Sequence, residues 1–135
     1  MIIYCLTGDN IQIPFDTLEG VSLENLNLHR ANLEKVNLSF SNLKNVNLRG
    51  AFLFKAILKN ANLESSNLIT IDLREADLTN ANLKNSTTYS ALFKGANLEG
   101  ANLEGAKIDG ADFTSANLSK ANMNCLEIEN AIFKN

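Results

Sequence analysis

The sequence predicts an all-β solenoid, a fold in which short repeated units stack along one axis. An apolar residue recurs at every fifth position from Leu18 to Phe133, and 23 of these 24 sites carry Leu, Phe, Ile or Met. A small or apolar side chain stands two residues before most of these sites, as in Ala31-Asn32-Leu33. Repetition at a fixed spacing indicates a solenoid, because each unit then buries its apolar face only against its neighbours.

The five-residue spacing also predicts how the chain runs within each unit. A helix would repeat its apolar residues at three and four positions and a strand at two, whereas this chain alternates gaps of two and three. The first and third residues of a unit therefore face inward from a short extended segment, and the last two residues make a corner. Residues that tolerate turn conformations occupy many corners. They include Gly50, Asn60, Asn80, Gly95, Gly100 and Gly110.

Several units resemble a known repeat family. The segment A-N-L-E-G occurs at 96–100 and again at 101–105, and A-D-F-T-S occurs at 111–115. These segments resemble the A-[DN]-[LF]-x-x unit of the pentapeptide repeat family, and the resemblance covers residues 16–135 in twenty-four tandem units. It implies a right-handed quadrilateral β-helix with four units in each twenty-residue coil, hence six coils. Residues 1–15 are then expected to form an N-terminal strand or hairpin cap.

Positions twenty residues apart agree with such coils, because like side chains fall above one another. One inward column runs Leu33, Leu53, Leu73 and continues with Phe93 and Phe113. Packing to crystal-like density along a stack favours such matched columns. Thr88 is the one third-position site without an apolar residue. Two interpretations stay open for it: a tolerated defect whose hydroxyl bonds to backbone, or a local weak point with a role.

The two ends of the stack differ in what covers them. Ile11 and Ile13 follow the repeat phase, which predicts one more edge strand from residue 11 to 15 beneath the first coil, with residues 1–7 folded back through the turn at residues 8–10. No amphipathic segment follows the last coil, and solenoids normally need a cap for solubility. We therefore expect a homodimer that pairs end to end. The candidate interface residues are Leu126, Ile128, Ile132 and Phe133.

The outer surface contains both regular ladders and irregular apolar positions. Each coil is expected to have four walls, one for each five-residue unit. Along one wall, Asn recurs at the second position, and Glu and Lys alternate at the fourth position from Glu24 to Glu104, which we interpret as structural stacking. We expect the five-residue phase to continue without a break from Leu18 to Phe133. An apolar surface elsewhere is a candidate protein-binding patch, with lateral self-packing or incidental exposure as alternatives. Its residues are Phe40, Phe52, Phe54, Ile57, Ile69, Tyr89 and Leu92.

No residue constellation predicts catalysis, a metal site or a cofactor. His29 is the only histidine, and Cys5 and Cys125 lie at opposite ends of the repeats, so they are expected as free thiols, with Cys125 at an outward corner. The glycines recur at period five rather than in a phosphate-binding motif. The sequence therefore predicts a protein that is not an enzyme.

Charge and hydropathy limit the partners that we expect. The net charge is −3 and no polybasic stretch occurs, so nucleic-acid binding is not expected. Residues 1–6 are apolar but too short for a signal sequence or a membrane span, which favours a cytoplasmic location without a membrane partner.

Two function classes follow from these observations. The first is a structural or interaction solenoid that binds an unknown protein or itself. The alternative, which the family resemblance implies, is a DNA-mimicking inhibitor of a type II topoisomerase such as gyrase. Mimicry needs a long negative surface, whereas residues 36–95 carry seven Lys and Arg against four Asp and Glu. The sequence therefore favours the interaction solenoid.

Overall fold

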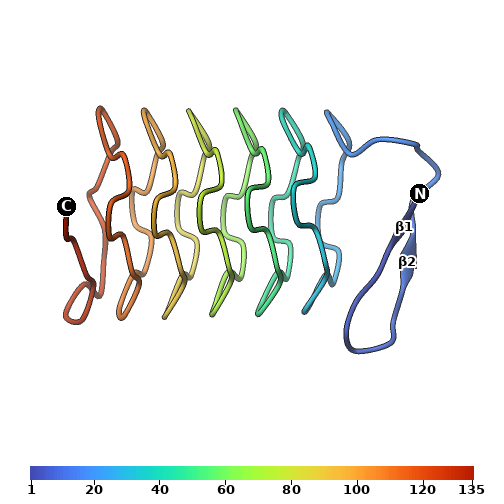
Figure 1. The fold of residues 1–135 in the computed structure, drawn as a ribbon, viewed down its shortest axis with the longest axis horizontal. Helices are drawn as coiled ribbons and strands as arrows, with labels where there is room; N and C mark the ends of the chain where they lie inside the picture. The colour runs from blue at the N-terminus through green and yellow to red at the C-terminus, as the bar shows by residue number, and fades with distance from the viewer.

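The computed structural model describes all 135 residues and shows a right-handed quadrilateral β-helix, as predicted. The coils stack into a rod, with a hairpin at the N-terminal end (Figure 1). In that hairpin, β1 (Ile2–Ile3) pairs antiparallel with β2 (Ile11–Gln12). All other pairing is through isolated bridges, which run parallel between residues twenty positions apart through most of the rod.

Corners of the coils are built from residues in the left-handed backbone region. Sixteen non-glycine residues have a positive φ, and fifteen of them stand at the fifth position of a unit, as Lys55 does at 58°. A turn closes each corner, as where the Ala31 N–H donates to the Leu28 carbonyl at 3.0 Å. The asparagine at the second position supports the turn, because Asn62 Oδ1 accepts the N–H of Glu64 at 3.2 Å.

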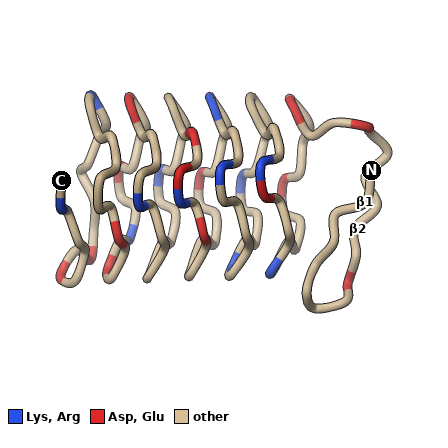
Figure 2. Tube along the Cα trace, in the orientation of Figure 1, with Lys and Arg blue, Asp and Glu red and all other residues tan.

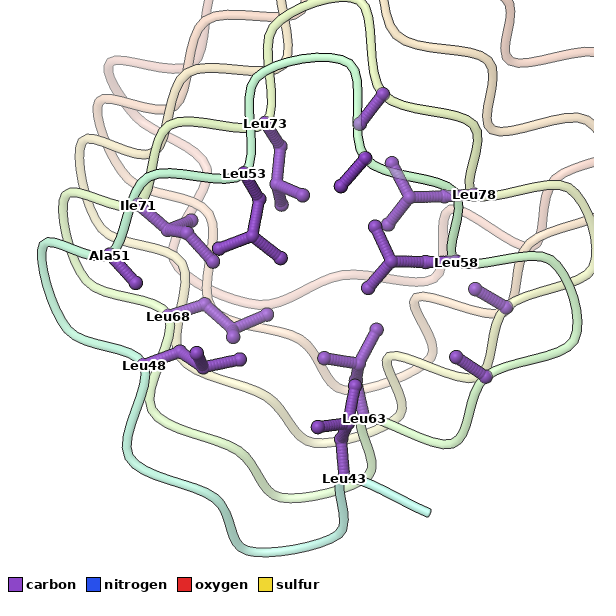
Figure 3. Packing of buried hydrophobic residues seen from close by; sticks show 14 of the residues in the cluster. Leu43, Leu48, Ala51, Leu53, Leu58, Leu63, Leu68, Ile71, Leu73 and Leu78 are labelled. Carbon is purple, nitrogen blue, oxygen red and sulfur yellow. The ribbon is translucent and has the colours of Figure 1, made fainter. Parts of the chain in front are cut away.

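Leucine, alanine and phenylalanine side chains fill the rod as one continuous cluster of 35 buried residues. Leucines of successive coils project inward above one another, as Leu43 and Leu63 do (Figure 3). The phenylalanine column forms parallel stacks, with ring centroids 4.7 Å apart for Phe93 and Phe113 and 5.1 Å for Phe113 and Phe133. The columns predicted from the twenty-residue period are therefore present in the core.

The predicted outer ladders form in part. Asn82 Nδ2 donates to Asn62 Oδ1 at 3.0 Å, so amide groups do connect coil to coil. Of the alternating charges, Lys44 pairs with Glu64 at 3.2 Å and Lys84 with Glu104 at 3.1 Å. These ion pairs are solvent-exposed and each contributes only about 0.2–1 kcal/mol.

Inward-facing hydroxyls are bonded to backbone with one exception. Ser41 and Ser66 donate to carbonyl oxygens three residues earlier, at 2.7 and 2.6 Å. Thr88 donates to the Lys107 carbonyl at 3.0 Å, which is what the tolerated-defect interpretation requires. The buried Ser86 hydroxyl has no hydrogen-bond partner.

The N-terminal hairpin covers the core differently from the prediction. The prediction that residues 11–15 form the edge strand beneath the first coil is wrong. The segment around Tyr4 and Cys5 pairs with the first coil instead: Cys5 forms an antiparallel bridge to Ala31, and the Asn32 N–H donates to the Tyr4 carbonyl at 2.8 Å. β1 continues into this segment and so separates β2 from the first coil. Alternate residues of the hairpin face the core, which leaves Ile3 and Ile13 buried.

The predicted unbroken phase is also wrong, in the last coil (residues 116–135). Lys107 pairs with Leu126 instead of Glu127, and the Leu126 N–H donates to the Ala106 carbonyl at 2.8 Å. This shift of one residue turns Cys125 inward against the core, where an outward corner was expected. Cys125 is the smaller side chain to place above Ala106, and its burial raises the pKa of the thiol.

Leu58 and Lys59 provide a test of the inward and outward assignment. Leu58 is fully buried, so Leu58→Ala should lower the free energy of unfolding by about 2–5 kcal/mol, the cost of a core cavity. The neighbouring Lys59→Ala removes only an exposed ion pair with Asp77 and should cost less than about 1 kcal/mol. Urea unfolding followed by circular dichroism measures both, and equal losses would contradict the assignment.

Ser86 provides a second test, because its hydroxyl is buried without a partner. Ser86→Ala removes an unpaired polar group and should leave the free energy of unfolding unchanged or raise it by about 1 kcal/mol. Ser66→Ala is the matched control, since it removes a hydrogen bond to Leu63 and should lower stability by about 1 kcal/mol. Thermal unfolding of the two variants side by side checks the difference in sign.

Candidate protein-binding surfaces

The predicted apolar patch is distributed over more than one wall of the rod. Phe52, Phe54 and Leu92 stand at outward positions of a single wall, while Ile57 lies on the wall that follows it in the chain. Leu92 and Ile57 are both 38% exposed. Ile69 and Tyr89 lie on the wall that precedes the wall of Phe52 in the chain. Phe40 is exposed and lies at the corner that ends the wall of Ile57.

A surface hollow of about 280 Å³ adjoins this patch. Phe54 lines it together with charged and small residues that sequence reasoning had not assigned to a site. The other lining residues are Arg74, Glu75, Lys94, Gly95 and Ser115. Gly95 is a corner residue with φ of +69°, and its missing side chain leaves space beside the longer Glu75. The column 54, 74, 94 follows from the twenty-residue period, but the hollow itself depends on how far these side chains reach, which the spacing does not give.

Most charges around the hollow are already paired within the chain. Arg74 donates from Nε to Asp72 Oδ1 at 2.8 Å and from Nη2 to Oδ2 at 2.7 Å. This hydrogen bonding lowers the pKa of Asp72 and raises that of Arg74. Lys55 pairs with Glu75 at 3.3 Å, whereas Lys94 forms no ion pair. Lys94 is therefore the cation of the hollow that is free to meet an anionic group.

Two of these cations lie near the ring of Phe54. Lys55 Nζ is 5.1 Å from the ring centroid and the Arg74 guanidinium carbon is 5.8 Å from it. Both distances lie within the range of cation–π attraction, which is worth about 0.5–1 kcal/mol at exposed sites. The ring is thus held on the surface as a fixed apolar contact.

The last coil carries the second candidate surface, and all four predicted interface residues are exposed there. Ile128 is 56% exposed and Phe133 is 53% exposed, whereas the equivalent Ile108 and Phe113 one coil below are 1% and 2% exposed. The other two, Leu126 and Ile132, are 55% and 39% exposed. The end of the rod therefore presents core-type side chains to solvent.

Backbone groups at this end are unpaired as well. One coil below, third-position N–H groups donate upward, as from Leu98 to the Asn117 carbonyl at 2.8 Å. The corresponding N–H groups of the last coil have no acceptor within the chain; they belong to Leu118, Met123, Ile128 and Phe133. A row of free donors beside apolar side chains is a template for pairing with another chain.

Side chains from three coils hold the shifted part of the last coil in place. Glu127 pairs through Oε1 with Lys107 Nζ at 3.0 Å, and the Tyr89 hydroxyl donates to the same carboxylate. These contacts, with the Tyr89 hydrogen bond first, lower the pKa of Glu127 and raise the pKa of Tyr89. Tyr89 of the predicted patch is thus tied to the last coil.

The structure shows no arrangement for metal or nucleophilic chemistry. No group of three or more His, Cys, Asp and Glu residues could hold a metal ion, and Cys5 and Cys125 are both free. Burial raises the pKa of each thiol, which is the reverse of the activation that a cysteine nucleophile needs. The structure also has no helix of the length and apolar character needed to cross a membrane.

Comparison with known proteins shows the family. A model of pentapeptide repeats matches residues 17–52, 56–87 and 90–135, with eight copies. The chain therefore belongs to the pentapeptide repeat family, and the resemblance found in the sequence is confirmed. No curated protein matches the chain.

Solved structures of other pentapeptide repeat proteins are similar to this one. Rfr23 from the cyanobacterium Cyanothece 51142 is 30% identical with a TM-score of 0.65, over 84% of this chain and 88% of that one. HetL from Nostoc sp. strain PCC 7120, involved in heterocyst differentiation regulation, is 28% identical with a TM-score of 0.34, over 85% of this chain and 60% of HetL. QnrB1, a plasmid-mediated fluoroquinolone resistance protein, is 14% identical with a TM-score of 0.45, over 86% of this chain and 90% of QnrB1.

The carboxylates on the wall of the hollow predict acid sensitivity. Hydrogen bonds from Arg74 lower the pKa of Asp72, and those from Thr114 lower that of Asp112. A carboxyl group whose pKa is lower in the folded protein than in the unfolded chain, where it is about 3.9, stabilises the fold at pH values above the unfolded-state pKa. That stabilisation is lost as the pH falls through the folded-state pKa. The melting temperature should therefore fall as the pH is lowered from about 5 to about 3.

Asp72→Asn isolates one of these contributions. Asparagine keeps the turn bond to the N–H two residues on, as Asn62 does, but has no charge for Arg74. Calorimetry from pH 5 to pH 3 should show a shallower decline for the variant than for the wild type. Parallel declines would contradict the role given to the Asp72 carboxylate.

Proposed function

We propose that this protein is a non-enzymatic interaction module that self-associates end to end through its last coil and binds a protein partner on a side wall. The open last coil is the observation that carries the proposal. Core-type side chains there, Ile128 and Phe133 among them, are more than half exposed, and the third-position N–H groups beside them have no acceptor.

A second copy of the chain is the occupant that suits this end best. Its last coil offers the same apolar side chains, so two copies related by a twofold axis bury the same patch on each. The phenylalanine column supports this arrangement, because Phe133 already stacks on Phe113 with its outer face uncovered. Pairing would cover the ring and the strand edges together.

The hollow on the side wall suits a different partner, an acidic segment with an apolar side chain. Lys94 supplies an unpaired cation and Phe54 supplies a fixed ring within one depression. Aromatic anchors in pockets with charge complementarity around them are typical of protein interfaces. The hollow therefore favours protein binding over a small-molecule site.

The alternative function, inhibition of a type II topoisomerase by DNA mimicry, has less support. Lys and Arg residues lie along the middle coils among the acidic residues (Figure 2). Several of them pair with carboxylates, as Lys44 does with Glu64 and Lys55 with Glu75, which neutralises the acidic residues of that region. We expect no inhibition in a gyrase supercoiling assay with the purified protein, and inhibition at low micromolar concentration would favour the alternative.

Light scattering across a concentration series tests the proposed self-association. The wild type should form a dimer, and Phe133→Ala should weaken it, because the substitution removes the exposed ring at the end of the rod. Phe54→Ala removes a ring from the side wall and is the matched control, which should leave the dimer unchanged. A monomer at every concentration, or equal effects of the two variants, would contradict the proposal.

A further inference from the structure

The last coil is the place where the sequence pattern and the structure disagree. We infer that this coil can pair with the coil beneath it in two registers one residue apart. The inference concerns the single chain and does not depend on the proposed function.

The repeat pattern defines the first register, called here the in-phase register. In it, Leu126 and Ile128 take the first and third positions of their unit and turn inward, while Cys125 takes a corner that faces outward. The units on both sides keep this phase, since Asn102 pairs with Asn122 and Asp112 with Ile132, each twenty positions apart. Only the segment between them departs from it.

The structure contains the second register, called here the shifted register. Lys107 pairs with Leu126, nineteen positions on, so Leu126 takes the outward place and Cys125 the inward one. The left-handed corner moves with it: φ is 51° at Glu127, and neither residue 125 nor residue 130 has a positive φ. Leu126 is consequently 55% exposed, whereas Ile128, at 56%, is about as open as the in-phase Phe133, at 53%.

Each register satisfies some local preferences and violates others. The in-phase register buries two apolar side chains, but it needs a left-handed cysteine and places a leucine above Ala106. The shifted register turns Leu126 outward and needs a left-handed Glu127, but it places the smaller Cys125 above Ala106. Opposing preferences within one short segment leave two arrangements close in free energy.

The thiol of Cys125 reports the register directly, because it faces the core in one register and solvent in the other. We would measure the rate of its labelling by an aromatic disulfide reagent in a Cys5→Ser protein, at a concentration where the chain is monomeric. Leu126→Asn removes a side chain that only the in-phase register buries, so labelling should slow by about fivefold. Ile132→Asn is the matched control, since residue 132 keeps its place in both registers, and should leave the rate unchanged.

The opposite shift is expected from a variant that makes room for the in-phase register. Ala106→Gly removes the methyl group beneath the place that Leu126 takes in that register, so it should speed labelling by about two- to fivefold. Ala101→Gly is the matched control, since Asn122 pairs with Asn102 in both registers, and should leave the rate unchanged. If Leu126→Asn left labelling unchanged or made it faster, Cys125 would be exposed by fraying, and the two-register inference would be overturned.

Discussion

The backbone ladder between coils is the constraint on which the rest of the structure depends. Most third-position N–H groups donate to the carbonyl nineteen residues further on, as Leu58 does to Asp77 at 2.7 Å. In a coil in the middle of the rod, the backbone N–H and C=O groups form hydrogen bonds to the coils on both sides. In a coil at an end, these groups are hydrogen-bonded on one side only, unless another segment covers them.

The two ends resolve this constraint differently. At the N-terminal end, the hairpin that contains β1 and β2 buries Ile3 and Ile13. Its Tyr4 carbonyl accepts a hydrogen bond from the Asn32 N–H of the first coil. At the C-terminal end, the shifted segment leaves Leu126 and Ile128 exposed. The candidate interface at this end therefore arises from the fold itself.

Prediction from the sequence succeeded where one preference decides the outcome. The twenty-residue columns, such as the stacked Phe93 and Phe113, followed from periodicity and family resemblance. Prediction failed where two residues or segments can take the same place. In the last coil, Cys125 rather than Leu126 takes the inward position. At the N-terminal end, the segment with Tyr4 and Cys5, rather than the one with Ile11, lies beside the first coil.

The candidate surfaces divide in the same way. All four residues predicted for the end of the rod are exposed there. The hollow beside Phe54 was missed, since it depends on how Arg74 and Lys94 extend around the small Gly95. Side-chain reach of that kind does not follow from spacing. The apolar patch and the end-to-end interface both stay predictions.

Amide hydrogen exchange tests the central claim, that an open ladder at the last coil is completed by a second copy. At low concentration, the N–H groups of Leu98 and Phe113 should be protected, and those of Leu118 and Phe133 should exchange freely. At high concentration, the latter two should gain protection while the former stay as they were. Equal protection of all four in the monomer, or none gained by Leu118 and Phe133 on concentration, would contradict the account.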